Sequence, residues 1–166
     1  MRLVMLLIVW ALSSGMGTTA AQPREQAPGS SVREVTLEVS TLDHGRWQLS
    51  QARGHWVLVN IWATWCGPCI TEMPELDEYA RSHPEVRVIG LAWQDASPAH
   101  IRRFLQRHRV SYPVAIIDPF APIGRFKRPT ALPTTYLIDP QGVLAHTFSG
   151  PITAALLERA MADPRS

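Results

Sequence analysis

The chain has two cysteines, which stand two residues apart in the segment Cys66-Gly67-Pro68-Cys69. A disulfide between them would close a very short loop, so it would add little stability by constraining the unfolded chain. A small fold held together by disulfides would need several cysteines spread along its length. The pair therefore indicates chemistry: exchange between a dithiol and a redox-active Cys66–Cys69 disulfide, with no separate cofactor.

An apolar segment and a helical pattern flank the cysteine pair. The near-continuous apolar run from Trp56 to Trp62 predicts a strand buried on both faces of a sheet. After the pair, apolar residues recur at helical spacing and predict a helix from about Pro68 to Arg81, kinked at Pro74. Pro68 suits the first turn of this helix, where backbone N–H groups have no partner within the helix.

These elements predict different roles for the two sulfurs. Cys66 is expected at the N-terminus of the helix, where unpaired N–H groups and the helix dipole favour a thiolate. Cys69 is expected one turn further along, more buried but within reach. We therefore expect Cys66 to attack a partner and Cys69 to resolve the mixed disulfide that forms.

Three other interpretations of the pair stay open. A zinc site needs four ligands, and no second Cys/His pair has suitable spacing. The six histidines show no ligand spacing either, so no metal is predicted. An inert structural disulfide would add little stability, because the loop that it closes is so short. Catalytic peroxide reduction would not by itself explain two cysteines placed so closely.

The rest of the chain alternates between strand and helix patterns. Strands are predicted over 32–39, 86–93, 114–117, 134–138 and 143–148. Helices are predicted over 98–109, 119–126 and 152–161. A strong turn signal, Asp139-Pro140-Gln141-Gly142, separates the last two strands. The pattern predicts an α/β fold with a central mixed β-sheet covered by helices on both faces.

The N-terminal sequence predicts export. A basic residue, Arg2, precedes the apolar run from Leu3 to Leu12, and small residues follow up to Ala21. We interpret residues 1–21 as a secretory signal peptide cleaved near Ala21. The run is short for a membrane span of about 20 apolar residues, yet an uncleaved membrane anchor stays open. Residues 22–31 are expected to form a linker and residues 32–163 the folded domain, in the periplasm or another extracytoplasmic space.

Charge excludes one class of partner. The formal net charge of +2 is too small to imply nucleic-acid binding. Five basic residues do gather between positions 102 and 109, and we interpret them as a solvated helix surface rather than a contact face: Arg102, Arg103, Arg107, His108 and Arg109.

The segment from Val57 to Cys69 resembles the active-site strand and turn of the thioredoxin superfamily. It is most similar to the exported TlpA-like branch, which includes the ResA and CcmG type proteins. Further similarities are Glu72-Met73-Pro74, Asn60 in place of the buried Asp of cytoplasmic thioredoxins, and the segment 132–139. The resemblance extends from Val32 to Met161. It implies a thioredoxin fold in which 86–128 supply the extra strand–helix insertion of the branch.

The resemblance also implies a substrate groove and a cis peptide bond between Leu132 and Pro133, although an ordinary proline before a strand is the alternative. It places Leu132 and Pro133 in that groove. Trp65, which flanks Cys66 and offers an apolar contact, is also expected to bind substrate, together with Gly67 and Pro68.

Glu72 is a candidate proton relay. It stands three residues after Cys69 and so shares its face of the helix. A partly buried carboxyl group has a raised pKa and can pass protons to or from a thiol. The resemblance favours this catalytic role over a surface glutamate in the first turn. Asn60 cannot relay protons as an Asp there would.

The leading hypothesis is a dithiol reductant of exported protein disulfides, supplied by a membrane-embedded electron donor. The resemblance implies apocytochrome c, with its CxxCH cysteines, as a substrate in cytochrome c maturation. The same fold can also oxidise or isomerise disulfides. An exported copper-binding carrier is a further alternative, but such carriers have a CxxxC pair with a partner histidine.

Overall fold

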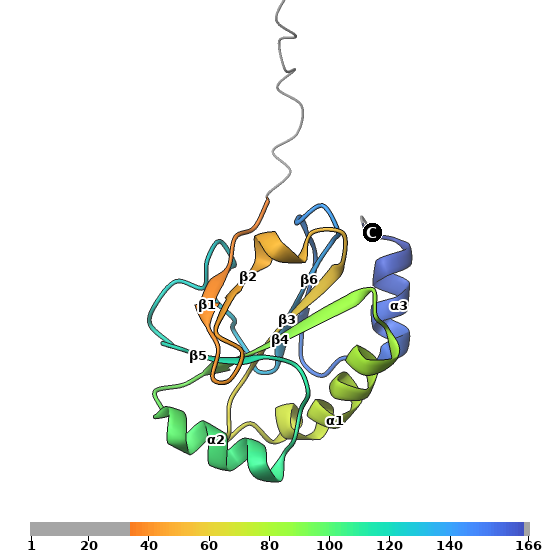
Figure 1. Cartoon of the computed structure of the whole chain (residues 1–166). Helices are drawn as coiled ribbons and strands as arrows, with labels where there is room; N and C mark the ends of the chain where they lie inside the picture. Colours follow the sequence, from red (N-terminus) through yellow and green to blue (C-terminus); the bar gives the residue numbers. More distant parts are fainter. Residues whose placement is uncertain (1–33, 165–166) are drawn as a thin grey trace, which may run out of the picture. The chain divides into compact units, whose positions relative to one another are not determined.

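A computed structural model describes residues 34–164, in which a five-stranded mixed sheet forms the centre (Figure 1). The strands lie in the order β5-β4-β3-β6-β7, where β3, β4 and β5 are parallel and β6 and β7 are antiparallel to their neighbours. Their bounds are β3 (Trp56–Trp62), β4 (Val86–Trp93), β5 (Val114–Ile117), β6 (Thr134–Ile138) and β7 (Leu144–Ser149). The predicted central mixed sheet is confirmed.

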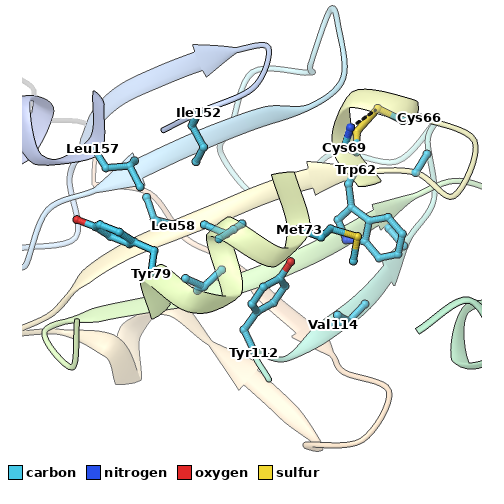
Figure 2. Packing of buried hydrophobic residues seen from close by; sticks show 14 of the residues in the cluster. Leu58, Trp62, Cys66, Cys69, Met73, Tyr79, Tyr112, Val114, Ile152 and Leu157 are labelled. Carbon is cyan, nitrogen blue, oxygen red and sulfur yellow. Dashed lines mark hydrogen bonds between the residues drawn. A yellow bond between two sulfur atoms is a disulfide. The ribbon is translucent and has the colours of Figure 1, made fainter. Parts of the chain in front are cut away.

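Helices cover one face of this sheet. They are α1 (Gly67–Ser82), α2 (Pro98–Arg107) and α3 (Ala154–Ala162). Met73 of α1, Ile101 of α2 and Leu157 of α3 join Leu58 and Trp62 of β3 in one buried cluster. Figure 2 shows four of these side chains, Leu58, Trp62, Met73 and Leu157, in that cluster. The layer that carries the cysteine pair is thus held on the sheet by apolar packing.

The opposite face is covered differently from the prediction. Because side chains alternate along a strand, Val57, Val59 and Ile61 of β3 point away from the helices. They pack with residues of the N-terminal segment and of the loop before β6, including Leu37 and Ile123. Among the described residues, no α-helical side chain joins this second cluster. Helices on both faces were therefore a wrong expectation.

The hairpin at the start of the described chain was not predicted. β1 (Glu38–Ser40) and β2 (Arg46–Gln48) form an antiparallel hairpin, followed by a 3₁₀ helix over Leu49–Ala52. Gly45, with φ at +70°, supplies the left-handed backbone that the hairpin needs. The strand predicted over 32–39 is reduced to an isolated bridge at Glu34 and the first residues of β1.

The helix predicted over 119–126 does not form; the segment consists of turns and bends. Pro119 and Pro122 cannot donate helical hydrogen bonds, and Gly124 has a φ of +53°. Elsewhere α2 and β5 follow β4, as the resemblance implies.

The predicted signal peptide and linker lie outside the described residues. Within residues 34–164, no helix has the length and apolar character needed to cross a bilayer.

Candidate active site

The cysteine pair lies where β3 gives way to α1. Cys66 is the N-cap of the helix, and its Sγ accepts a hydrogen bond of 3.3 Å from the backbone N–H of Cys69. Pro68 occupies the first turn, as predicted. The two cysteines form a disulfide with their Cα atoms 5.3 Å apart. The Cys66 sulfur therefore lies at the end of the helix where partial positive charge would stabilise its thiolate.

The surroundings of the two sulfurs differ. Cys69 is fully buried and Cys66 is 5% exposed, whereas Gly67 and Pro68 between them are exposed. Trp65, directly before Cys66, is 69% exposed, which is unusual for a large aromatic side chain. In Figure 2 the disulfide lies at the edge of the buried cluster, close to Trp62. A partner can therefore approach Cys66 more readily than Cys69.

The loop before β6 lies at the same end of the sheet. The peptide bond between Leu132 and Pro133 is cis, which confirms the prediction. Thr134, the next residue, pairs with Ile61 near the end of β3. Leu132 is half-buried and packs against the cluster that contains both cysteines. Pro133 is buried, and its carbonyl accepts a hydrogen bond of 2.8 Å from the N–H of Gly150.

Glu72 is buried beneath the helix and is only 4% exposed. Its Oε1 accepts a hydrogen bond of 2.8 Å from Asn60 Nδ2, and its Oε2 accepts one of 3.1 Å from the N–H of Ile152. Burial raises the pKa of this carboxyl, the two hydrogen bonds oppose the rise, and the nearby charge of Glu75 adds to it. The alternative of a surface glutamate in the first turn is therefore wrong.

Asn60 connects Glu72 to the sheet. It is fully buried on β3, opposite Thr135 of β6, and its Nδ2 also donates a 3.0 Å hydrogen bond to Thr135 Oγ1. Its Oδ1 is buried and makes no hydrogen bond within the described part of the chain. The sequence had indicated that Asn60 replaces the buried Asp of cytoplasmic thioredoxins and cannot relay a proton, but it did not predict the hydrogen bonds to Glu72 and Thr135.

Gln94 is a site residue that sequence reasoning missed. Its Oε1 accepts hydrogen bonds from the backbone N–H of Thr64, at 2.7 Å, and from Thr64 Oγ1, at 3.1 Å. It thereby holds the loop between β3 and Cys66. The available signal was a polar residue directly after the apolar run of β4, at the end of the sheet where sites gather in α/β folds.

Over residues 34–164, no group of three or more His, Cys, Asp or Glu side chains is arranged to hold a metal ion.

The geometry agrees with comparisons to known proteins. The family model described as AhpC/TSA family matches residues 28–147. The chain belongs to this family. It is 30% identical over 162 residues to the thiol-disulfide oxidoreductase ResA of Bacillus cereus, covering 95% of this chain and 91% of that protein. It is 40% identical over 97 residues to the thiol:disulfide interchange protein DsbE of Allochromatium vinosum, covering 58% of this chain and 52% of that protein. The chain thus aligns with about half of that DsbE.

Solved structures confirm the fold. A DsbE-type thiol:disulfide interchange protein of Chlorobium tepidum superposes with a TM-score of 0.68 at 24% identity, covering 80% of this chain and 95% of that one. StoA of Bacillus subtilis superposes with a TM-score of 0.59 at 17% identity, covering 77% and 97%. The predicted thioredoxin fold and the similarity to the TlpA-like branch are confirmed. This family member is a thioredoxin-like thiol–disulfide oxidoreductase.

Proposed function

We propose that the protein is an extracytoplasmic dithiol reductant of disulfides in exported proteins. One observation carries the proposal: Cys66 caps the N-terminus of α1 beside an exposed Trp65, with Cys69 buried one turn further along. In this arrangement Cys66 is the attacking cysteine and Cys69 is the resolving cysteine.

The exchange proceeds in two balanced steps. The Cys66 thiolate of the reduced protein attacks one sulfur of the substrate disulfide, which breaks that bond and releases the other sulfur as a thiolate. Cys69, after losing its proton, attacks the Cys66 sulfur of the mixed disulfide and releases the second substrate sulfur. The substrate gains two electrons and two protons, and the protein is left with the Cys66–Cys69 disulfide. A membrane-embedded dithiol donor returns the protein to its reduced form.

Glu72 takes the proton that Cys69 must lose before the second step. The carboxyl lies one turn beyond Cys69 on α1, and its raised pKa brings its proton affinity closer to that of a thiol. Its hydrogen bonds to Asn60 and to the backbone of Ile152 fix the position of the carboxyl. Proton transfer is thus separated from the surface where the partner docks.

We expect the substrate to bind between the exposed turn and the cis-proline loop. Trp65 offers an apolar surface next to Cys66, and Gly67 and Pro68 leave the backbone beside the sulfur accessible. Leu132 and Pro133 are expected to contact the substrate from the other side, since Leu132 is half-buried and packs on the cluster that holds the cysteines.

The proposed compartment and substrate rest on the sequence and on the relatives. The predicted signal peptide supports a site outside the cytoplasm. The relatives are named for thiol–disulfide exchange, and the resemblance to the TlpA-like branch supports the disulfide of an apocytochrome c CxxCH segment as a substrate.

The test is to mix the reduced full chain with an oxidised CxxCH peptide and to count peptide thiols by mass spectrometry. The proposal predicts reduction of the peptide together with formation of the Cys66–Cys69 disulfide. Net oxidation of a reduced CxxCH peptide by the disulfide form, with no reaction in the other direction, would show an oxidant instead. Tight copper binding without disulfide reduction would favour the carrier.

A further inference from the structure

A basic hollow adjoins the active-site turn. It has a volume of about 560 Å³. We call it the α2 basic hollow, and its lining residues are Thr64, His100, Arg103, Phe104, Gln106 and Arg107. Thr64 stands two residues before Cys66 and is fixed by its hydrogen bonds to Gln94. The hollow is therefore bordered by the loop that leads from β3 to Cys66.

The cations of this hollow are available to a partner. Helix α2, from Pro98 to Arg107, contains no Asp or Glu. Arg102 on the same helix is engaged, because it bonds to Asp43 at 3.1 Å and to the carbonyl of Leu42 at 2.7 Å. Arg103 and Arg107 are exposed and form no ion pair with any residue between 34 and 164.

The helix that carries these arginines is fixed relative to the active site. The ring of Phe104 stacks on Trp62, the last residue of β3, with ring centroids 5.4 Å apart. The Phe104 ring also stacks on the imidazole of His108, with ring centroids 4.5 Å apart. Ile101 of the same helix is fully buried in the cluster that contains Leu58 and Trp62 of β3. The backbone beneath the two guanidinium groups is therefore held against the strand that leads to Cys66.

We propose that the α2 basic hollow binds an acidic segment that flanks the disulfide of a protein substrate. The proposal rests on the proposed function and adds the chemical class of the substrate. Guanidinium groups bind carboxylates through paired hydrogen bonds, and unpaired cations beside a reactive group raise the encounter rate with an anionic partner. The gain appears mainly in the association rate and is screened by salt.

The experiment compares two oxidised CxxC peptides of equal length, one flanked by aspartates and one by serines. The second-order rate of their reduction by the reduced full chain is measured at low and at high salt. We expect the acidic peptide to react about 3 to 10 times faster than the serine peptide at low salt, and the advantage to disappear at high salt.

The variant Arg103→Gln/Arg107→Gln tests the location of the effect. It should lose most of the advantage of the acidic peptide. A matched control, Arg46→Gln/Arg81→Gln, removes the same charge from residues that pair elsewhere and do not line the hollow. That control should keep the advantage. Because both peptides are measured on every variant, the effect of aspartates on the peptide's own thiols cancels.

A small neutral substrate, hydroxyethyl disulfide, separates the two proposals. Its unchanged reduction by the double variant would show that the cysteine site is intact. Equal rates for the two peptides, or an equal loss in both double variants, would overturn the assignment of the hollow while leaving the proposed function in place. Failure to reduce any of the disulfides would overturn the proposed function, and this inference with it.

Discussion

Asn60 Nδ2 donates a hydrogen bond of 2.8 Å to Glu72 Oε1, which joins the central strand of the sheet to the helix that begins at the cysteine pair. The hydrogen bond favours the ionised carboxylate, while burial favours the protonated acid. Burial is the larger effect, so the pKa of Glu72 is raised. The amide therefore limits how far that pKa rises.

Replacing Asn60→Ala should raise the pKa of Glu72 further, because a hydrogen bond to the charged form is lost. The carboxyl carbon shift of Glu72, followed by NMR across a pH titration, reports this directly. Thr135→Val is the matched control, since it removes an acceptor of Asn60 but leaves the bond between Asn60 and Glu72. A pKa that stays put or falls in Asn60→Ala would contradict the account.

The stability of the protein should depend on pH through Glu72. Its pKa in the folded state is raised from 4.5, so the stability that it contributes is fully present below that value and is lost as pH rises through the folded-state pKa. Glu72→Gln removes this titration. If the Asn60 side-chain amide flips, so that its oxygen and nitrogen exchange places, its Oδ1 can accept a hydrogen bond from the amide that Glu72→Gln introduces; in the wild type this atom makes no hydrogen bond among the described residues.

Urea unfolding of the wild type and Glu72→Gln, from about pH 4 to about pH 8, measures this difference. The free energy of unfolding of the wild type should fall relative to the variant as pH rises. A difference that does not change with pH would show that Glu72 titrates alike in the folded and unfolded states.

The two cysteines should differ in the intermediate that they leave. Cys69→Ser should accumulate a mixed disulfide between Cys66 and a substrate, because the resolving sulfur is gone. Cys66→Ser should form far less of it, since Cys69 is fully buried. Turnover should fall to the uncatalysed rate in both variants. Non-reducing gels and mass spectrometry measure the adducts, and equal trapping through either cysteine would contradict the assigned roles.

Two glycines with left-handed backbone should differ in their tolerance of a side chain. Gly45 has a φ of +70° and open space around it, so Gly45→Ala should cost about 1–2 kcal/mol from backbone strain alone. Gly124 has a φ of +53°, and a Cβ there would lie 1.9 Å from the carbonyl oxygen of Thr36. Gly124→Ala should therefore cost about 2–5 kcal/mol, measured by chemical unfolding. Equal losses would show that the close contact relaxes freely.

The strands of the central sheet could be predicted from the sequence almost to the residue. Trp56–Trp62 and Val86–Trp93 are apolar runs bounded by polar or turn residues, and such strands are buried on both faces. The hairpin of β1 and β2 could not be predicted, because its strands of three residues are too short to show a period. The apolar residues around Ile123 suggested a helix because periodicity alone does not reveal a left-handed glycine.

The reacting residues of the site could be predicted from the sequence better than the hydrogen bonds that position them. The spacing of Cys66 and Cys69 is local, so the sequence displays it directly. The burial of Glu72 depends on Asn60 of β3 and on the backbone of Ile152, which are distant in the sequence and meet only in the folded chain. The hydrogen bonds from Thr64 to Gln94 likewise join residues that follow two neighbouring strands, β3 and β4, and are 30 positions apart in the sequence.

The equilibrium reduction potential of the Cys66–Cys69 pair distinguishes a reductant from an oxidant. The full chain is equilibrated in dithiothreitol redox buffers, its thiols are trapped, and the two forms are counted by mass spectrometry. A dithiol reductant requires a potential near or below about −250 mV. A potential near about −120 mV would contradict the account, because the disulfide would then oxidise thiols of exported proteins rather than reduce their disulfides.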